Sequence, residues 1–376
     1  MKLAILKERR DGETRVAATA ETVKKLKGLG LDVAVETGAG ASARVGDADY
    51  LAAGATIAPD MNAALAGADI VLKVRPPLPD EIAAMKKGCV LAALLAPYTE
   101  TETAAGLAAQ GVSAFAMEFI PRISRAQAMD VLSSQANLAG YKAVIDAAAT
   151  FGRAMPMMMT AAGTIAPARV LVMGVGVAGL QAIATARRLG AIVSATDVRP
   201  ATKEQVESLG ASFVAVIDDE FKQAETASGY AKPMSAEYQA KQAALIAETI
   251  KKQDIVITTA LIPGRKAPVL VSEEMVKTMK PGSIIVDLAA EQGGNCPLTR
   301  PNEVYEIHGV TLMGYTNLPG RLAADTSALY ARNLFNFVAL IVDKKTGALA
   351  LDWDDEIVKG AGLTRDGEIV HPGLKG

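Results

Sequence analysis

The sequence predicts an α/β protein with two doubly wound parallel-sheet domains joined by long helices. At 376 residues the chain is too long for one hydrophobic core of ordinary size. Short β-rich runs alternate with helical stretches in both halves, as in parallel sheets covered by helices on both faces. Half of the residues are apolar and only 4% are aromatic, which suits alanine-rich packed layers.

The first domain is predicted from β-rich runs in the first 120 residues, with helices at 20–30 and 80–88 between them. A late helix at 327–343 and the tail behind it should fold back onto this domain. The domain therefore comprises residues 1–125 and 326–376. Its expected strands lie at 3–6, 32–36, 69–74, 89–95 and 113–118.

The second domain, residues 151–325, repeats the same alternation of strands and helices. Residues 126–150 form the linking helix between the two domains. The expected strands of the second domain lie at 170–174, 192–197, 212–216, 254–260, 283–289 and 310–315.

The linking helix is predicted to begin at Ser124, with Gln127 reaching back as in a capping box. On the helical period Met129, Leu132 and Ala136 form an apolar stripe. A second face carries hydrogen-bonding groups and one charge, whereas a face meant only for water usually carries Lys and Glu. We therefore expect this face to hold a ligand. Its members are Gln127, Asp130, Ser133, Ser134 and Asn137.

Two connectors differ from ordinary loops. The run Met157–Met159 is expected to pack beneath the second domain, since flexible thioether side chains fill irregular gaps. The polar segment 218–241 is longer than a connection inside a compact domain should be. Tyr230 and Met234 in that segment favour a lid over a linker.

Composition excludes several classes of function. The net charge is −2 without a basic cluster, so nucleic acid is not an expected partner. Two histidines and cysteines of no metal-binding spacing give a transition-metal site little to build on. Apolar runs fall short of the roughly 20 residues that span a bilayer, and the N-terminus lacks a signal-peptide pattern. Cys89 and Cys296 are expected to be packed thiols in a reducing cytoplasm.

A dinucleotide site is predicted at Gly174, Gly176 and Gly179, a GxGxxG between a strand and a helix. The first glycine makes the turn, the second admits a pyrophosphate and the third lets helix pack on strand. Asp197 ends the next strand, where a carboxylate accepts both ribose hydroxyls. It favours NAD(H) over NADP(H), because a 2′-phosphate would lose these bonds and meet a like charge. Arg199, two residues on, softens this preference in principle but lacks a second basic residue to complete a phosphate clamp.

The chain lacks an obvious general base, although oxidation of an alcohol or amine by NAD⁺ also releases a proton. His308 falls on a short turn before a late strand, and His371 lies in the C-terminal tail. Neither position is typical of a catalytic histidine. Lys73 is the remaining candidate.

Motifs along nearly the whole length resemble the NAD(H)-binding component of proton-translocating NAD(P) transhydrogenase. The block 121–144, PRISRAQAMDVLSSQANLAGYKAV, is the most specific of them. The others lie at 7–19, 71–77, 174–186, 228–235, 258–270 and 286–298.

This resemblance implies a cofactor, a set of site residues and partners. Arg122, Gln127, Asp130 and Ser133 hold the carboxamide and the nicotinamide ribose, and Tyr230 belongs to a mobile loop that folds onto the nucleotide. The implied cofactors are NAD(H) here and NADP(H) on a partner subunit. A homodimer is also implied. Membrane-spanning partner subunits would hold the chain at the cytoplasmic face of the inner membrane. Because the chain ends without an apolar extension, we expect these partners to be separate chains. The expected cofactor-binding residues are Gly174, Gly176, Val177, Gly179, Asp197, Arg199, Gly229, Tyr230, Ala260 and Leu261.

The related alanine dehydrogenases share both domains but differ at the acid–base centre. Arg15 and Lys73 match that family's substrate residues, whereas Ala96 and Glu291 stand where its catalytic His and an Asp are found. Direct transfer between two nicotinamide rings needs no base, so the transhydrogenase interpretation explains this departure. Two alternatives stay open: an alanine-dehydrogenase-like enzyme that uses Lys73, and a module that binds NAD without catalysis. The polar face is alternatively a wet seam between domains, in which Arg122 pairs with Asp130.

Overall fold

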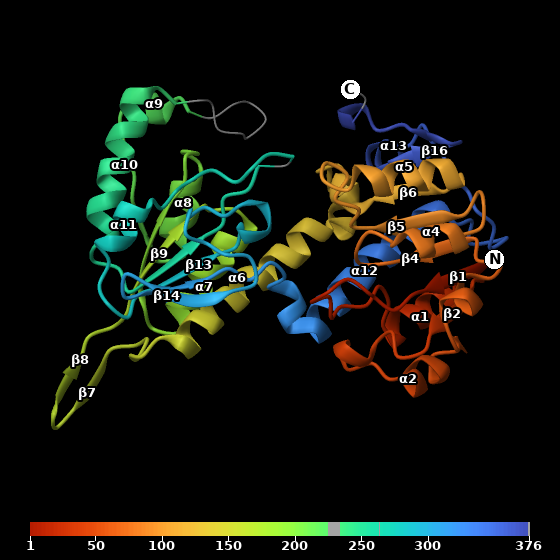
Figure 1. Ribbon diagram of the computed structural model, residues 1–376, viewed down its shortest axis with the longest axis horizontal. Helices are drawn as coiled ribbons and strands as arrows, with labels where there is room; N and C mark the ends of the chain where they lie inside the picture. The colour runs from red at the N-terminus through yellow and green to blue at the C-terminus, as the bar shows by residue number, and fades with distance from the viewer. Residues whose placement is uncertain (225–233, 263, 375–376) are drawn as a thin grey trace. The chain divides into compact units, whose positions relative to one another are not determined.

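The computed structural model describes residues 1–224, 234–262 and 264–374 (Figure 1). The chain forms two compact units, one comprising Met1–Gln135 and Pro319–Gly376 and the other Ala136–Leu318. Each unit has its own mainly parallel sheet. The predicted fold class, two doubly wound α/β sheets linked by helices, is confirmed.

The six-stranded sheet of the first unit has the order β3-β2-β1-β4-β5-β6, and every pairing in it is parallel. This is the doubly wound order, in which the chain reverses direction across the sheet after the third strand. The edge strand β3 is too short for its alternation to be recognised in the sequence. The strands are β1 Lys2–Ile5, β2 Asp32–Glu36, β3 Thr56–Ala58, β4 Ile70–Leu72, β5 Val90–Ala93 and β6 Ser113–Ala116.

Helices cover both faces of this sheet. The first, α1, is held at its start by a capping box between Thr19 and Thr22. The late helix α12 packs Leu334, Phe337 and Ile341 into the same core as β1 and β2. The helices are α1 Ala20–Lys27, α2 Asp47–Ala52, α3 Met61–Leu65, α4 Pro79–Ala84, α5 Thr101–Gln110, α12 Ala323–Ile341 and α13 Glu356–Ala361, with a hairpin of β16 Thr364–Arg365 and β17 Glu368–Ile369.

The seven-stranded sheet of the second unit has the order β11-β10-β9-β12-β13-β15-β14. All pairings are parallel except that of β14, an antiparallel edge strand that the sequence analysis did not predict. Strands buried on both faces read as continuous apolar runs, which is why β9, β12 and β13 were recognisable. The strands are β9 Arg169–Met173, β10 Ile192–Thr196, β11 Ser212–Phe213, β12 Ile255–Thr258, β13 Ile284–Asp287, β14 Val304–Ile307 and β15 Val310–Met313.

The helices of the second unit pack on both faces of its sheet (Figure 1). The long helix α6 begins in the first unit and continues into the second, where Ala139, Ala143 and Ala147 join the core. The helices are α6 Val131–Thr150, α7 Val177–Arg188, α8 Thr202–Ser208, α9 Asp219–Lys222, α10 Ala236–Ile250 and α11 Glu273–Lys277.

The prediction that the linking helix begins at Ser124 and runs through 126–150 is wrong at its N-terminus. Residues Ser124–Met129 form a 3-10 helix, η3, whose start has no side-chain cap. Asp130 leaves helical geometry, and the α-helix begins at Val131. The cap is Asp130 itself, which accepts the backbone N–H of Ser133 at 2.9 Å. The predicted apolar stripe also fails, because Leu132 is 46% exposed.

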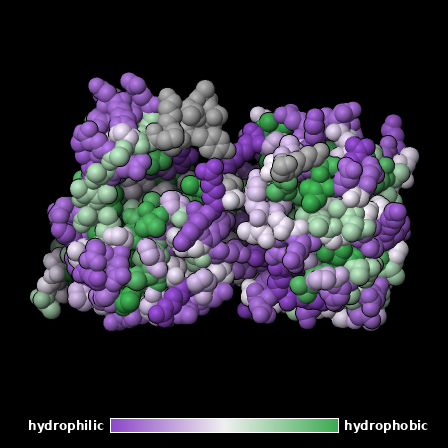
Figure 2. All heavy atoms as spheres, turned by 45° about the horizontal axis from the view of Figure 1, so that its top comes forward, coloured by the Kyte–Doolittle hydropathy of each residue, from purple (hydrophilic) through white to green (hydrophobic). Residues whose placement is uncertain are grey.

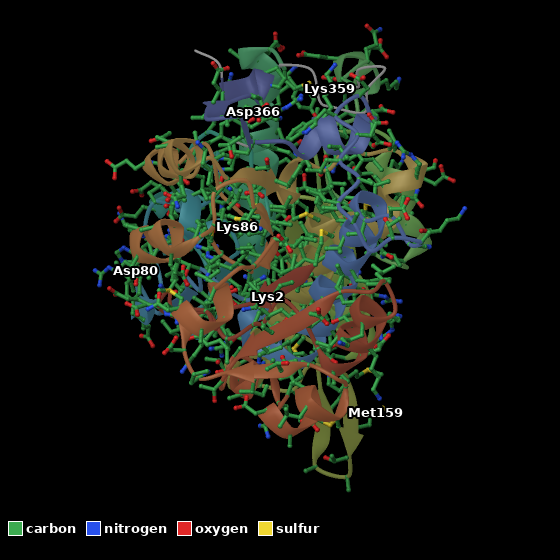
Figure 3. The ribbon with its side chains drawn as sticks, turned by 90° about the vertical axis from the view of Figure 1, so that its right-hand side faces the viewer. Lys2, Asp80, Lys86, Met159, Lys359 and Asp366 are labelled. Carbon is green, nitrogen blue, oxygen red and sulfur yellow. The ribbon has the colours of Figure 1, made fainter. Side chains whose placement is uncertain are left out.

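The Met157–Met159 run does not pack beneath the second unit, so that expectation is wrong. Two short antiparallel strands, β7 Met158–Thr160 and β8 Gly163–Ile165, form a hairpin in which every residue is exposed. The hairpin projects from the body of its unit, and Met159, labelled in Figure 3, is 77% exposed. An exposed group of apolar side chains of this kind is typical of a surface that binds a partner.

The described parts of the predicted lid at 218–241 are largely helical. Asp218 caps α9 by accepting the N–H of Phe221, and Ser235 caps α10 by accepting the N–H of Tyr238. Asp and Ser are common both in loops and at helix N-caps, so the sequence alone favoured a loop at these positions. Gly229 and Tyr230 lie outside the described residues.

Among the described residues, none of the helices has both the length and the apolar character needed to span a membrane. The visible faces of the units mix hydrophilic and hydrophobic residues (Figure 2). Cys89 and Cys296 are buried free thiols, and burial raises the pKa of Cys89 to about 12.

Candidate functional site

The loops at the carboxyl edge of the second unit's sheet meet where its strand order reverses. Strand β9 lies between β10 and β12, and the chain leaves β9 toward one side and returns on the other. In open α/β sheets a ligand binds in the crevice at this position. The GxGxxG turn follows β9 there and leads directly into α7.

The three glycines of this turn meet three different requirements. Gly174 has φ +100°, and a Cβ there would lie 2.5 Å from Thr259 Oγ1. A Cβ on Gly179 would lie 1.9 Å from the carbonyl oxygen of Gly174, so this glycine lets α7 pack on the turn. Among the described residues, nothing lies within 4 Å of a Cβ on Gly176, which leaves open space at the start of α7.

The N-terminus of α7 is built to receive an anion. Gly176 is its N-cap residue and offers no side chain to the first-turn N–H groups. Val177 follows as the first helical residue and is 39% exposed. Unsatisfied N–H groups and the helix dipole together favour a phosphate in this position.

Asp197 lies at the end of β10, as the sequence predicts, and its carboxylate is fully engaged. It accepts the N–H of Val175 at 2.7 Å and the N–H of Arg199 at 2.9 Å. The Arg199 side chain adds a bidentate pair, with Nε and Nη2 both 2.9 Å from the carboxylate oxygens. A ribose that binds Asp197 must therefore displace part of this arginine fork.

The loop after β12 lies beside the glycine turn. Thr259 donates its hydroxyl to the carbonyl of Gly174 at 3.0 Å. Ala260 is held by the side chain of Asn295, and Leu261 is 47% exposed. Asn295 was not predicted as a site residue; an asparagine after a double glycine carries no periodic signal that would have identified it.

At the start of α6 the structure brings Asp130 and Ser133 together. The Ser133 hydroxyl donates to Asp130 Oδ2 at 2.5 Å, and both residues are half-buried. Arg122 and Gln127 precede the helix on the 3-10 segment and its approach, and both are exposed. Within the described residues Arg122 forms no ion pair with Asp130. This removes one argument for the alternative that the polar face is a wet seam between domains.

Ser134, which the sequence analysis placed on the same face, contacts another helix of its own unit. Its hydroxyl donates to Asn333 Oδ1 on α12 at 2.7 Å. Asn333 in turn donates to the carbonyl of Ala128 at 2.8 Å. Because the α-helix starts at Val131, Gln127 is not on its surface and the predicted face divides into two parts.

Arg15 supports the same turn of α6 through Gln135. It forms a buried bidentate pair with Glu13, at 2.8 and 2.7 Å, and donates to Gln135 Oε1 at 2.8 Å. Gln135 also donates to the carbonyl of Thr326 at 3.1 Å. Arg15 is therefore engaged by the protein's own groups and anchors the residues next to Ser133.

Lys73 is also paired internally. It is 1% exposed and lies 2.8 Å from Glu81 and 3.4 Å from Glu8. Burial raises the pKa of Glu8, and the nearby Lys73 opposes that shift. Arg9 continues the cluster to Glu81 and Glu36.

Ala96, where the sequence analysis expects the catalytic histidine of alanine dehydrogenases, adopts φ +45°. Glu118 holds this turn by accepting the N–H groups of Leu95 and Ala96, at 2.9 and 2.6 Å. The backbone of this turn has a positive φ, which is uncommon for a residue other than glycine. The methyl side chain of Ala96 can neither donate nor accept a proton.

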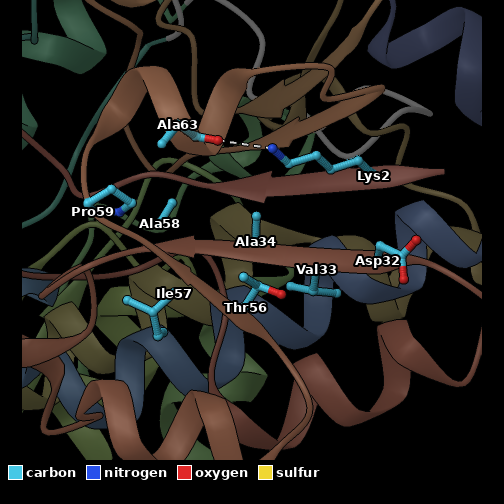
Figure 4. Close-up of a pocket in the computed structure, with 9 residues that line it drawn as sticks. All are labelled: Lys2, Asp32, Val33, Ala34, Thr56, Ile57, Ala58, Pro59 and Ala63. Carbon is cyan, nitrogen blue, oxygen red and sulfur yellow. Dashed lines mark hydrogen bonds between the residues drawn. The ribbon is translucent and has the colours of Figure 1, made fainter.

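A cavity of about 330 Å³ lies elsewhere in the first unit, along β2 and β3 (Figure 4). Its lining is mostly apolar, and the Lys2 ammonium group there donates to the carbonyls of Ala63 and Ala66. Its lining runs from the starts of β1 and β2 along the whole of β3, and the described lining residues include no convergent catalytic groups. We assign it no role in binding nucleotide.

Two family models match most of the chain. The alanine dehydrogenase/PNT N-terminal domain matches residues 4–139 and the C-terminal domain of the same name matches 143–372. The chain belongs to the alanine dehydrogenase/PNT family.

Within this family the chain is similar to transhydrogenase subunits over its whole length. The first part of the alpha subunit of NAD(P) transhydrogenase from Rhodospirillum rubrum is 58% identical over 100% of this chain and 99% of the relative. The crystal structure of transhydrogenase from Sinorhizobium meliloti has a TM-score of 0.90 and 54% identity, covering 98% of this chain and 100% of that one. A solved L-alanine dehydrogenase has a TM-score of 0.84 at 27% identity, covering 99% and 98% of the two chains. The predicted transhydrogenase subunit, with alanine dehydrogenase as the more distant relative, is confirmed.

Proposed function

We propose that the chain binds NADH and passes its hydride directly to NADP⁺ held on a partner subunit. One contrast within the structure supports this most strongly. The second unit presents an open glycine turn beside Asp197, while Arg15 and Lys73 in the first unit are engaged by internal partners. The chain therefore has a place for a dinucleotide, and its two alanine-dehydrogenase substrate residues serve structural contacts.

The described residues fit the parts of NAD(H) as follows. The first turn of α7, from Val177, binds the pyrophosphate, and Gly176 leaves room for its approach. Asp197 accepts the adenosine ribose hydroxyls once Arg199 yields its fork. Ala260 and Leu261 lie beside the glycine turn on the β12 side, which receives the nicotinamide half. Gly229 and Tyr230 complete the proposed set from outside the described residues.

Arg122, Gln127, Asp130 and Ser133 are proposed to hold the nicotinamide carboxamide and its ribose. The exposed Arg122 and Gln127 offer donors, and the Asp130–Ser133 pair offers an acceptor with a hydroxyl. Bound NADH supplies the hydride. Because no hydroxyl or amine proton is lost in transfer between two rings, the protein needs to orient one ring and leave one face free, with reacting carbons about 3–3.5 Å apart.

The partners are proposed from the relatives and from one surface of the chain. The Rhodospirillum rubrum relative is named as one portion of an alpha subunit, and so belongs to an enzyme of several chains. We propose NADP(H)-binding and membrane-spanning partner subunits, which hold the chain at the cytoplasmic face of the inner membrane and couple transfer to proton translocation. The exposed hairpin with Met157, Met158, Met159 and Ile165 supports a homodimer, because monomeric surfaces seldom expose such a group of apolar residues.

The decisive experiment mixes the purified chain with NADH, an oxidised NADP analogue and the NADP(H)-binding partner domain, and follows absorbance. Rapid hydride transfer only with the partner present supports the proposal. Formation of NADH from alanine and NAD⁺ by this chain alone would instead establish the alanine-dehydrogenase alternative. Binding of NADH without transfer under either condition would leave a nucleotide-binding module.

Two variants test the nicotinamide-side residues. Arg122→Ala and Asp130→Asn are each expected to slow transfer at least tenfold, because misplacement of the ring by about 1 Å has effects of this size or larger. Arg125→Ala is the matched control, since Arg125 lies on the same 3-10 segment as Gln127 and pairs with Asp355. Normal transfer in the first two variants would support the alternative that the polar face is a wet seam between domains.

A further inference from the structure

The side chain of Asn295 joins two parts of the loop that follows β12. Its Oδ1 accepts the N–H of Ala260 at 3.1 Å, and its Nδ2 donates to the carbonyls of Ala260 at 2.9 Å and Pro268 at 2.8 Å. Asn295 is completely buried. One carboxamide therefore fixes both backbone polar groups of Ala260 and closes the base of the loop between residues 260 and 268.

Asn295 is itself held in place by Asp287, the last residue of β13. The Asp287 carboxylate is 1% exposed and accepts the N–H of Asn295 at 2.8 Å. The same carboxylate also accepts from Thr258, Ala289, Cys296 and Thr299. A buried carboxylate with this many donors has little freedom to move, so the Asn295 amide is presented in one orientation.

A second bond holds the same loop from its other side. The hydroxyl of Thr259 donates to the carbonyl of Gly174 in the glycine turn. The segment Thr259–Ala260 is thus tied to the turn after β9 through Thr259 and to the loop after β13 through Asn295. Leu261 and Ile262, immediately beyond, are 47% and 44% exposed. The loop presents them to solvent from a rigid base.

The position of this loop indicates which half of a dinucleotide it faces. Asp197 immediately follows β10, which pairs with one edge of β9, whereas β12 pairs with the opposite edge. A dinucleotide at the switch point lies across β9, with its adenosine over the β10 side. The nicotinamide half consequently lies over the β12 side, next to Ala260.

We propose that Asn295, assisted by Thr259, is a positioning residue that fixes the nicotinamide side of the nucleotide site without touching the reacting atoms. This proposal rests on the proposed function, since it assumes that the second unit binds NAD(H). It predicts that loss of the Asn295 side chain weakens binding of the nicotinamide half and leaves binding of the adenosine half unchanged. Removal of its carboxamide loosens the loop after β12 and leaves the contacts of Asp197 and the glycine turn in place.

The test compares two ligands in calorimetric titrations of Asn295→Ala and the wild-type chain. ADP-ribose contains the adenosine, the pyrophosphate and the second ribose but lacks the nicotinamide ring, which NADH also carries. We expect the variant to bind NADH about tenfold more weakly, the value of one or two lost hydrogen bonds, and ADP-ribose within about twofold of wild type. Intact ADP-ribose binding also shows that the unit is folded.

Thr259→Val provides a second variant in case Asn295→Ala fails to fold. It keeps the shape of the side chain, removes the bond to Gly174, and is expected to weaken NADH binding about threefold, again with ADP-ribose unaffected. Thr278→Val is the matched control, because Thr278 donates its hydroxyl to the carbonyl of Met275 on α11, remote from this edge of the sheet. The control should bind both ligands as wild type does.

With partner domain present, Asn295→Ala should raise the KM for NADH and lower kcat, because a loosely held ring reaches the transfer geometry less often. Equal weakening of NADH and ADP-ribose would show that Asn295 supports the whole fold, and unchanged NADH binding would show that it positions nothing; either result overturns the proposal. Failure of the wild-type chain to bind NADH would instead refute the proposed function itself.

Discussion

The carboxyl edges of the two sheets have the same topology and opposite chemistry. In the first unit, charged side chains gather at this edge and pair with one another, with Lys73 between Glu8 and Glu81 and Arg9 beside Glu36. In the second unit the corresponding edge carries glycines and an open helix N-terminus beside Asp197. A shared architecture therefore does not determine which edge receives a ligand.

The difference lies in where the polar groups find partners. Backbone N–H groups at the start of α7 have no side-chain cap, so they remain available to an anion. Arg15 and Lys73 are buried and already have carboxylate partners. A substrate carboxylate would have to displace such a partner, which would then be buried without its cation. The first edge consequently serves as a structural support, and the second is the proposed binding site.

The largest expected effect comes from breaking the internal pairing of the first edge. Lys73→Met should lower the free energy of unfolding by about 3–5 kcal/mol, because it leaves Glu8 buried without its cation and Glu81 with Arg9 alone. Chemical denaturation measures this directly. If stability were unchanged while an alanine-oxidising activity disappeared, Lys73 would be catalytic and the comparison of the two edges would fail.

A methyl group in the glycine turn should weaken NADH binding as well as stability, whereas one in a loop of the first unit should affect stability alone. Gly174→Ala places a Cβ against Thr259 and disfavours the observed φ of +100°, so NADH affinity should fall by at least about tenfold. Gly12→Ala, in the loop after β1, is the control: it also has a positive φ, +74°, but nothing lies within 4 Å of its Cβ. It should lose about 1 kcal/mol of stability and keep its NADH affinity. Equal losses of affinity would contradict the assignment of the site to the second unit.

Ala96 offers a smaller test of the first edge. Its φ of +45° is costly for alanine, so Ala96→Gly should raise the free energy of unfolding by about 0.5–1 kcal/mol after the greater entropy of the unfolded glycine is included. Thermal unfolding together with NADH titration measures both properties. Stability should rise without a change in affinity, and a loss of affinity would indicate that this turn still contributes to a ligand site.

The smallest effect concerns His371, which stacks on Phe119 with ring centroids 4.0 Å apart. Burial lowers its pKa, so its neutral form stabilises the fold above the unfolded pKa of about 6.5, and this contribution disappears as the pH falls through the folded pKa. His371→Gln should flatten the unfolding free energy between about pH 7.5 and 5.5 by no more than about 0.5 kcal/mol. NADH binding at pH 7.5 should not change. A change would indicate that residues of the first unit also contribute to the nucleotide site.

The nucleotide-binding turn was predictable because its signals are local. Gly174, Gly176 and Gly179 lie within six residues, and Asp197 ends the next strand. Strands buried on both faces are likewise visible as apolar runs. The predictions failed where two local signals compete: Ser124 looks like a cap, but Asp130 closes the turn that starts α6, and Ser235 and Asp218 cap helices inside an apparent loop.

The sequence by itself determined the two α/β units, the dinucleotide motif and the departure from alanine dehydrogenase at Ala96, because each depends on residue type at short spacing. Tertiary structure decided what Arg15, Lys73 and Asn295 do. Their partners, Gln135, Glu81 and Ala260, come from other elements, and for Arg15 the partner lies 120 residues away. Whether a buried polar side chain binds a ligand or another part of its own chain depends on which groups the folded backbone brings within hydrogen-bonding distance.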